Sequence, residues 1–278
     1  MRSCGKRPRM QVGCYSESMR ISVIVPAFNE AWHLASTLDH IRTSSAAFER
    51  AGWAVELIVC DNNSTDATAA IAAAAGAHVI FEPINQISRA RNAGASAASG
   101  DWLIFVDADS HPSAELLEAV AAQIRGGRCL AGGSTITFGT RQVSVRLAAW
   151  AWNTCSRVTR WAAGSFIFCE RAAFLAAGGF SLSLFAAEEI DLFRRLKRRA
   201  RTEHRTIVIL RAHPLWTSDR KARLYSLREW ATFMRRTILA RGATLRSAGQ
   251  CYAWYDGRRE DVSGREGRVE STCSGRTA

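Results

Sequence analysis

Two aspartates stand one residue apart at the end of an apolar run, DWLIFVDADS, which begins at Asp101. A continuous apolar run of this length is typical of a strand that is covered on both faces of a parallel sheet. Because side chains alternate along a strand, Asp107 and Asp109 are expected to point to the same side at its carboxyl end, where ligands of open α/β sheets bind. Their oxygen atoms could share one hard divalent cation. Taken alone, the motif favours a simpler alternative, in which both acids only end the strand in a polar turn.

Polar residues also follow two earlier apolar runs. The first run leads into PAFNE at 26–30, and the second leads into DNNSTD at 61–66. Since adjacent strand ends of a parallel sheet form one crevice, these residues should converge with Asp107 and Asp109. The Asp61 carboxylate could accept hydrogen bonds from the edge of a base, whereas capping of the following helix is enough to explain Asp66.

Two arginines, Arg89 and Arg91, precede the DWLIFVDADS run, and a guanidinium group there can grip phosphate oxygens with two hydrogen bonds. Solvation at the surface is the alternative, and it suits Arg89 better than Arg91. The sequence has no G-x-G-x-x-G turn after the first strand and no G-x-x-x-x-G-K-[ST] motif, which counts against a dinucleotide cofactor and a P-loop. Phosphate groups are therefore expected to be held through a metal.

The elements that would position these residues follow from the hydrophobic pattern. Strands are predicted at 21–25, 55–60, 78–81 and 103–108, with helices at about 30–50, 65–75 and 86–98 between them. This alternation indicates an α/β fold with a Rossmann-like, mostly parallel central sheet flanked by helices. The later part is less regular, and its predicted elements are helices at 114–124, 143–161, 171–177, from about 187 and at 224–240, and strands at 130–138, 164–170 and 205–210.

The length of 278 residues and the 47% hydrophobic content are sufficient for one large α/β domain. We expect a disordered leader at 1–19, two halves of the same domain at 20–112 and 113–245, and a largely disordered tail at 246–278. Met19 directly precedes the first predicted strand and is a plausible initiator. Eight scattered cysteines without Cys-x-x-Cys spacing indicate neither a zinc site nor a disulfide framework, and they fit a reducing cytosol.

The formal net charge is +12 and comes almost entirely from arginine. A basic surface can attract nucleic acid, acidic substrates or anionic lipid, and the charge total does not choose among them. No apolar run approaches the roughly 20 residues that span a bilayer, which predicts a soluble or peripheral protein. The amphipathic segment 143–161 interleaves tryptophan with arginine, and core packing is favoured for it over binding to a membrane surface or an acceptor.

Four segments occur in an order that resembles family 2 glycosyltransferases of the GT-A fold: ISVIVPAFNE, IVCDNNSTD, RARNAGASAASGDWLIFVDADS and AAGSFIFCERAAFLAAGGFSLSLFAAEEIDLFRRLKR. The likeness covers roughly residues 20–220 and is specific for the family but not for the sugar. It implies inverting transfer of a hexose-like sugar from a UDP- or GDP-sugar to a hydroxyl of a sugar or lipid-linked acceptor. The implied setting is cell-envelope or polysaccharide biosynthesis in the cytoplasm, with peripheral contact at the inner membrane face left open and no nucleic-acid partner.

The resemblance also implies roles for particular residues. The half at 20–112 would bind the nucleotide sugar, through Pro26, Ala27, Phe28, Glu30, Asp61, Arg91, Asp107 and Ala108. Asp109 would coordinate a Mg²⁺ or Mn²⁺ ion that bridges the diphosphate, with Asp107 near the ribose or the metal. His213 could be a later metal ligand of the kind that some members use, although a lone histidine after a strand is more often structural.

A carboxylate in a Glu-Asp pair serves as the general base in this family, and here the matching residues are Glu188 and Glu189, followed by Asp191. Glu189 stands where aspartate is usual, which leaves the identity of the base open among the three. Helical geometry puts 188 and 191 on one face and turns 189 about 100° away. We predict Glu189 as the base and Asp191 as the second candidate, while complementing the helix dipole is the alternative role for these acids.

Two other classes of function remain open from the sequence. A phosphatase or phosphotransferase with an aspartyl nucleophile also uses Asp-x-Asp, but it needs the motif near the start of the chain, a Gly-Thr after it and a lysine downstream, whereas Ser110 and His111 follow here. A non-catalytic basic protein that binds nucleotide or lipid would explain the charge but not the three polar strand ends.

Overall fold

The structure is a computed structural model that describes residues 19–140, 142–220, 224, 227–240, 242–251 and 255 of the chain. The predicted leader, apart from Met19, therefore lies outside the described residues, and so does the predicted tail beyond Tyr255. Met19 itself is buried, and its carbonyl oxygen accepts a hydrogen bond from the backbone N–H of Ala54.

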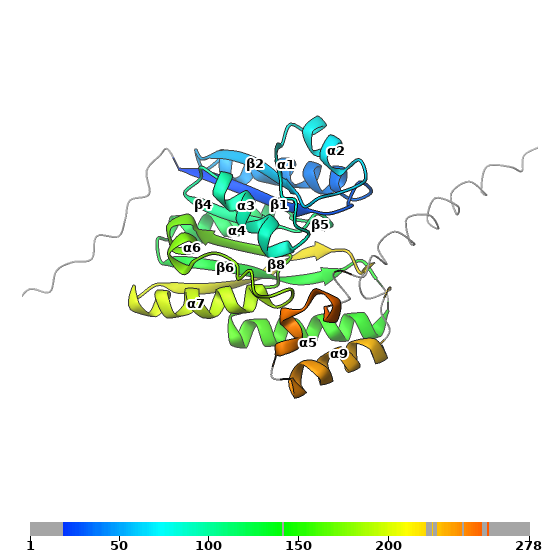
Figure 1. Cartoon of the computed structure of the whole chain (residues 1–278). Coiled ribbons are helices and arrows are strands. Elements are labelled where there is room, and N and C mark those ends of the chain that lie inside the picture. The colour runs from blue at the N-terminus through cyan, green and yellow to red at the C-terminus, as the bar shows by residue number, and fades with distance from the viewer. Residues whose placement is uncertain are drawn as a thin grey trace, which may run out of the picture.

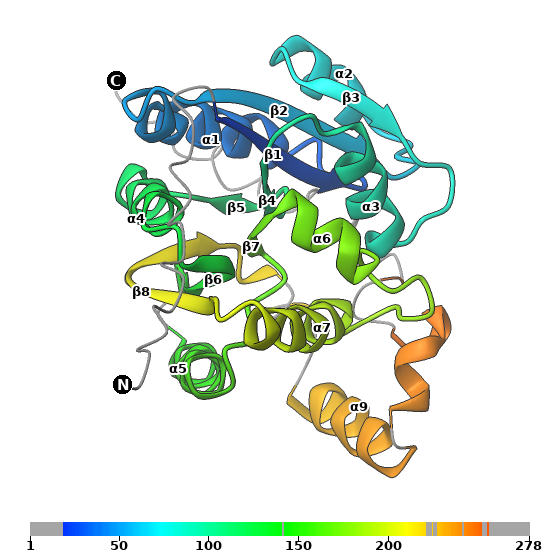
Figure 2. The same cartoon turned by 90° about the vertical axis from the view of Figure 1, so that its left-hand side faces the viewer.

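One sheet of eight strands runs through the described part of the chain, in the order β3-β2-β1-β4-β7-β6-β8-β5 (Figure 2). The strands are β1 (Arg20–Ala27), β2 (Ala54–Asp61), β3 (His78–Phe81), β4 (Trp102–Val106), β5 (Ser110–His111), β6 (Cys129–Phe138), β7 (Phe166–Glu170) and β8 (Thr206–Thr217). Neighbouring strands are parallel except where β7 meets β4 and β6 and where β5 meets β8. This confirms the predicted mostly parallel α/β sheet. Both predicted halves contribute strands to it.

Helices cover both faces of the sheet. They are α1 (Leu34–Glu49), α2 (Thr68–Ala74), α3 (Ile87–Ala97), α4 (Ala114–Arg125), α5 (Val143–Thr159), α6 (Arg171–Ala177), α7 (Glu188–Thr202) and α9 (Leu227–Leu239). Figures 1 and 2 show α1 and α4 on one face and α3, α6 and α7 on the other. No helix in the described ranges is long and apolar enough to cross a membrane.

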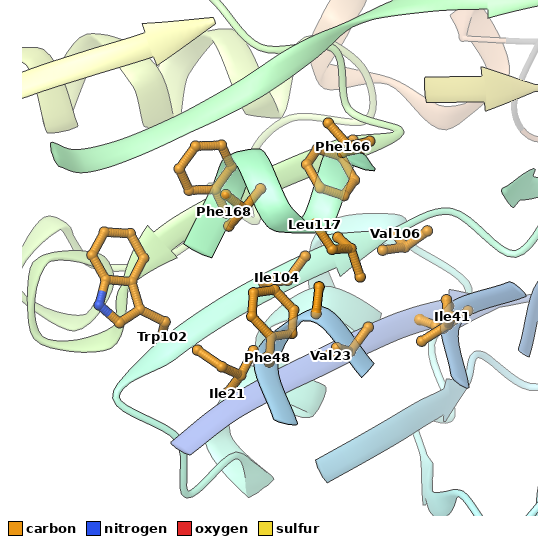
Figure 3. Packing of buried hydrophobic residues seen from close by; sticks show 14 of the residues in the cluster. Ile21, Val23, Ile41, Phe48, Trp102, Ile104, Val106, Leu117, Phe166 and Phe168 are labelled. Carbon is orange, nitrogen blue, oxygen red and sulfur yellow. The ribbon is translucent and has the colours of Figure 1, made fainter. Parts of the chain in front are cut away.

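The central strands are pinned by two cores, one on each face. Ile104 of β4 packs toward α1 and α4, whereas its neighbours Leu103 and Phe105 pack toward α6 and α7 (Figure 3). Alternation of this kind is what a doubly covered strand requires, and a slip by one residue would exchange the two cores. Each large apolar side chain buried in this way contributes about 1.5 to 3 kcal/mol. The register of the central strands, and with it the position of their carboxyl ends, is therefore fixed.

Helix α3 lies unusually close to the sheet because it carries Gly94. A Cβ atom at Gly94 would lie only 2.5 Å from Cγ2 of Ile24 in β1. Glycine is the residue that permits such a close approach of two backbones. The approach matters for the site, since Arg91 lies one turn earlier on the same helix.

Three predictions about local structure need correction. Strand β4 ends at Val106, so the two aspartates lie in the turn that follows and not on the strand itself. Helix α5, for which core packing was favoured, buries only Val145 and Ser156. The described part of the predicted disordered tail is packed, because it contains a 3₁₀ turn (Ala248–Gln250) and a fully buried Cys251.

Helix α7 begins after a residue with strained backbone. Ala187 has φ 60° and ψ 21°, in the left-handed region, and it directly precedes Glu188. This conformation costs a residue with a Cβ atom roughly 1 to 2 kcal/mol. The left-handed conformation turns the chain at this point, and the helix then begins with Glu188, which binds Arg91.

Replacing Ala187 by Gly should therefore stabilise the protein by about 0.5 to 1 kcal/mol, since the steric penalty exceeds the entropic cost of glycine. Urea denaturation measures this change in the free energy of unfolding. As a control, Ala119→Gly in the ordinary helical interior of α4 should destabilise by about 0.5 to 1 kcal/mol. A loss of stability in both variants would show that Ala187 is not strained.

Candidate active site

A cleft lies at the carboxyl ends of β1 and β4, with about 570 Å³ of empty space when the open solvent at its mouth is included. Most of the residues predicted for the donor pocket form its wall, namely Pro26, Ala27, Phe28, Glu30, Asp107, Ala108 and Asp109. Asn62, from the predicted segment 61–66, is also in the wall, and the sequence analysis did not single out the remaining wall residues, which are Asn85, Ile87, Ala90, Arg220 and Tyr255. The structure thus brings residues from all three predicted polar segments into one cleft.

The loops after β1 and β2 are tied together by side-chain hydrogen bonds. Asn29, at φ 51°, accepts the backbone N–H of Thr65 at 2.8 Å and donates its own to Oγ of Ser64 at 3.0 Å. Asp66 accepts the backbone N–H of Ala31 at 3.0 Å and that of Thr68. Asp66 therefore has the predicted structural role of capping, and it also fixes the loop that carries Glu30.

Asp61 lies beside the cleft and is not part of its wall. It is buried at the end of β2, and its Oδ1 accepts the backbone N–H of Ser64 at 3.1 Å. Its neighbour Asn62 is in the wall and holds the loop before α3, donating to the carbonyl oxygen of Ile84 at 2.6 Å and accepting the backbone N–H of Gln86 at 2.9 Å. Asn63 has φ 66°, a left-handed turn conformation that asparagine adopts more readily than most residues.

Arg91 lies beneath the cleft with only 1% of its side chain exposed. Nη2 donates to Oδ1 of Asp107 at 2.9 Å and to the carbonyl oxygen of Gly164 at 2.8 Å, and Nη1 donates to Oε1 of Glu188 at 2.7 Å. Burial opposes the charge, but the carboxylates of Asp107 and Glu188 raise the pKa of Arg91. A grip on phosphate, as predicted, would require these contacts to break. The structure instead shows Arg91 as the link between β4, the loop before β7 and α7.

The three acids at the start of α7 differ sharply in their surroundings. Glu188 is buried and paired with Arg91, whereas Asp191 is paired with Arg195 on its own helix at 2.7 Å. Glu189 lies next to Gly164, where an added Cβ would come within 3.7 Å of its Cδ. Desolvation and the charge of Glu188 raise the pKa of Glu189 to about 8. None of the three belongs to the wall of the cleft.

Arg220 is a site residue that the sequence analysis missed. Its guanidinium group binds both carboxylate oxygens of Glu30, at 3.0 and 2.6 Å, and lies 3.7 Å from Oδ2 of Asp109. Burial lowers the pKa of Arg220, but the Glu30 carboxylate outweighs this and raises it. The only local signal was a basic residue soon after the last strand, which is common at protein surfaces.

The two aspartates fit a divalent cation in the chemistry of their donor atoms. Arg91 binds one carboxylate oxygen of Asp107, Oδ1, which leaves the other oxygen for a cation. Asp109 is mostly buried at the same cleft and can also offer carboxylate oxygens. Mg²⁺ in particular is usually bound by one or two carboxylates, with phosphate and water completing its shell. Among the described residues, no group of three or more His, Cys, Asp or Glu side chains is assembled for a metal. Two carboxylates plus a substrate phosphate are thus the set that the site can offer.

His213 is not brought to these aspartates. It lies within β8 and outside the wall of the cleft. The histidine nearest to the two aspartates in sequence is His111. Its ring is stacked between the rings of His40 and Trp216, with centroid distances of 4.1 and 4.4 Å. Desolvation lowers the pKa of His111 to about 4, so this ring is neutral near pH 7.

The C-terminal segment supplies another residue that the sequence did not assign to the site. Tyr255 lies in the wall of the cleft, its hydroxyl accepts the backbone N–H of Ile87 at 3.4 Å, and its ring contacts Phe185 edge-on. Gln86 ties the same region to the segment before α7, donating to the carbonyl oxygens of Leu182 and Leu184 at 2.9 Å. The cleft is therefore enclosed by segments from both ends of the described chain.

Comparisons with known proteins show similarity to glycosyltransferases. An uncharacterized glycosyltransferase of Mycobacterium bovis is 34% identical over 113 residues, which are 41% of this chain and 47% of that protein. An undecaprenyl-phosphate 4-deoxy-4-formamido-L-arabinose transferase of Enterobacter is 30% identical over 115 residues, which are 38% and 34% of the two chains. This chain thus matches about half of its curated relatives' length or less.

The fold is also found in a solved structure of glucosyl-3-phosphoglycerate synthase from Mycobacterium tuberculosis, in complex with Mn²⁺, UDP and phosphoglyceric acid. The TM-score is 0.54 at 21% identity, with 80% of this chain and 76% of that chain covered. The sequence profile of glycosyl transferase family 2 matches residues 22–179, which include β1 to β7 and the two cleft aspartates. On the match to more than half of its length, the chain belongs to glycosyl transferase family 2.

Proposed function

We propose that this protein transfers a sugar from a nucleoside-diphosphate sugar to an acceptor hydroxyl, with inversion at the anomeric carbon. The observation that carries the proposal is the single buried network in which Arg91 joins Asp107 of the cleft to Glu188, beside Glu189. A network of this kind couples an acidic pair suited to a diphosphate-bound cation with a carboxyl group suited to proton abstraction.

The donor is proposed to occupy the cleft between the loops after β1, β2 and β4. Support comes from the wall residues Phe28 and Asn62, from the carboxylates of Asp107 and Asp109, and from the related fold that was solved with UDP and Mn²⁺. A Mg²⁺ or Mn²⁺ ion held by Asp109 and Asp107 would supply positive charge for the departing nucleoside diphosphate. His213 is left out of this ligand set because it is not in the cleft.

Glu189 is proposed as the general base. Its raised pKa makes the ionised carboxylate a stronger base than an ordinary glutamate, and Arg91 engages Glu188 instead. In the reaction, Glu189 takes the proton of the acceptor hydroxyl, whose oxygen bonds to the anomeric carbon as the bond to the diphosphate breaks. Asp191 is a weaker candidate because its carboxylate is held by Arg195.

The acceptor is proposed to be a sugar or a lipid-linked molecule that approaches from the side of α7. The relatives' names point to chemically different acceptors, a lipid phosphate in one case and phosphoglyceric acid in the structural neighbour. Both acceptors attack through an oxygen atom. A phosphate oxygen already carries negative charge, whereas a hydroxyl group must lose its proton, and the proposed base is needed for the hydroxyl.

Replacing Asp109 by Asn should remove most of the thermal stabilisation that UDP or GDP gives in the presence of Mn²⁺, because a neutral amide is a poorer ligand for a hard cation. The measurement is the melting temperature with nucleotide, with and without Mn²⁺. Asp39→Asn, on the exposed face of α1, is the matched control and should keep the shift. An unchanged Mn²⁺-dependent shift in the Asp109 variant would overturn the metal assignment.

Replacing Glu189 by Gln should reduce kcat by about a hundredfold or more while the donor still binds, since general base catalysis typically contributes 10²- to 10⁴-fold. Transfer to an acceptor and the nucleotide-dependent thermal shift measure the two effects separately. Asp191→Asn is the comparison, and its smaller effect is expected to fall on stability. If the Asp191 variant lost transfer and the Glu189 variant kept it, the base would be Asp191.

The rate should also rise with pH through about 8, where Glu189 loses its proton. Below that pH the carboxyl group is protonated and cannot accept the proton of the hydroxyl, so kcat/KM should fall about tenfold per unit. A pH profile of kcat/KM from pH 6 to 9.5, which reports ionisation in the free enzyme, checks this expectation. A flat profile across this range would contradict it.

A further inference from the structure

Helix α5 leaves most of its surface uncovered. Of its 17 residues, only Val145 and Ser156 are buried, and they anchor one narrow face of the helix to the protein. In both views the helix lies in the part of the molecule away from α1 and α2, and α9 lies toward the same end (Figures 1 and 2). Its outer face therefore has no cover within the described part of the chain.

The outer face of α5 carries an apolar stripe. Large apolar side chains on this face are exposed by 68%, 58%, 65% and 81%, and they are Val143, Leu147, Trp150 and Val158. At 100° per residue these four positions fall within an arc of about 80°, roughly opposite Val145 and Ser156. Scattered exposed apolar residues are ordinary, but four large ones aligned along one face of a helix, interrupted only by Thr154, mark an interaction surface.

Arginines lie along the edge of this stripe. Arg146 and Arg157 follow the same helical edge, and with Arg211 of β8 and Trp150 they line a groove that contains about 930 Å³ of empty space. The sequence contains no aspartate or glutamate between Glu118 and Glu170. The surface is thus apolar and cationic, with no acid on the helix to neutralise it.

We propose that α5 is a docking surface for an anionic lipid membrane. The apolar stripe would enter the boundary between headgroups and acyl chains, while Arg146, Arg157 and Arg211 bind lipid phosphates, in the way that amphipathic helices lie in a membrane interface. A second copy of the chain is the weaker occupant. A symmetric contact through α5 would bring Arg146 and Arg157 against the same residues of the partner, and like charges oppose such pairing.

Docking through α5 would place the membrane near the chemistry. Gly164 follows the last residue of α5, Thr159, by five positions, and its carbonyl oxygen contacts Arg91. Five residues span at most about 18 Å. A lipid-linked acceptor could therefore reach the proposed base from the bilayer, a consequence that rests on the proposed function, whereas the docking itself does not.

The test is sedimentation of the full chain with vesicles at about 0.15 M ionic strength. The protein should bind vesicles of an equal mixture of phosphatidylcholine and phosphatidylglycerol but not of phosphatidylcholine alone. The double variant Arg146→Glu/Arg157→Glu should partition at least a hundredfold less, because each basic residue contributes on the order of 1 kcal/mol and both are reversed. The double variant Leu147→Ser/Trp150→Ser should lose at least tenfold.

The controls place single substitutions of the same two kinds elsewhere on the surface, and the single variants Arg157→Glu and Trp150→Ser are measured beside them. Arg42→Glu on α1 should leave partitioning within a few fold of the native protein, and so should Leu175→Ser on α6, a residue that is 51% exposed. All variants should keep the native melting temperature, because the altered side chains lie outside the cores. Vesicle binding needs no substrate, so a failure of sugar transfer would leave this result unaffected.

Three results would overturn the proposal. The first is that the native protein does not bind the anionic vesicles. The second is that the α5 variants bind them as well as the controls do. The third is that light scattering finds a dimer that the variant of Leu147 and Trp150 dissociates, which would assign the surface to a second copy.

Discussion

The buried guanidinium group of Arg91 is the interaction on which the rest of the site depends. A charge with 1% exposure is tolerated only if opposite charges and hydrogen bonds replace the water it has lost, and here Asp107, Glu188 and the carbonyl oxygen of Gly164 do so. One guanidinium group carries a single positive charge, which is one fewer than the two carboxylates that it binds. Glu189 is a third acid in the group, and its pKa is raised by desolvation and by the charge of Glu188. The same network thus holds the cleft aspartate and sets the protonation of the proposed base.

The sheet makes this network possible because it fixes where its members lie. Opposed cores on the two faces of β4 hold its end at one level, and the close packing of α3 on β1 through Gly94 brings Arg91 under that end. Antiparallel β7 then pairs with β4, so that the loop with Gly164 returns to the same place. Arg91 and Glu188 lie on helices, whereas Asp107, Asp109, Glu30 and Gly164 lie in the short segments that follow or precede the strands.

A second ion pair closes the other side of the cleft. Arg220, just beyond β8, binds Glu30, just beyond β1, and reaches toward Asp109. It lies outside residues 22–179, where the family profile matches, and so does Tyr255. The part of the chain that matches the family therefore carries the two cleft aspartates, while the later part supplies an arginine and a tyrosine to the wall of the cleft.

The sequence by itself determined the order of strands and helices, the parallel start of the sheet and the residues at its strand ends. Neighbouring residues are enough to predict these features, through the apolar periodicity and through polar residues such as Asp107 and Asp109 that end an apolar run. Only the tertiary structure decided the partners. Arg91 and Glu188 are 97 positions apart, and Glu30 and Arg220 are 190 apart, so no local pattern connects them. Burial of α5 was misjudged for the same reason, because an amphipathic helix carries the same pattern whether its apolar stripe meets a core or remains uncovered.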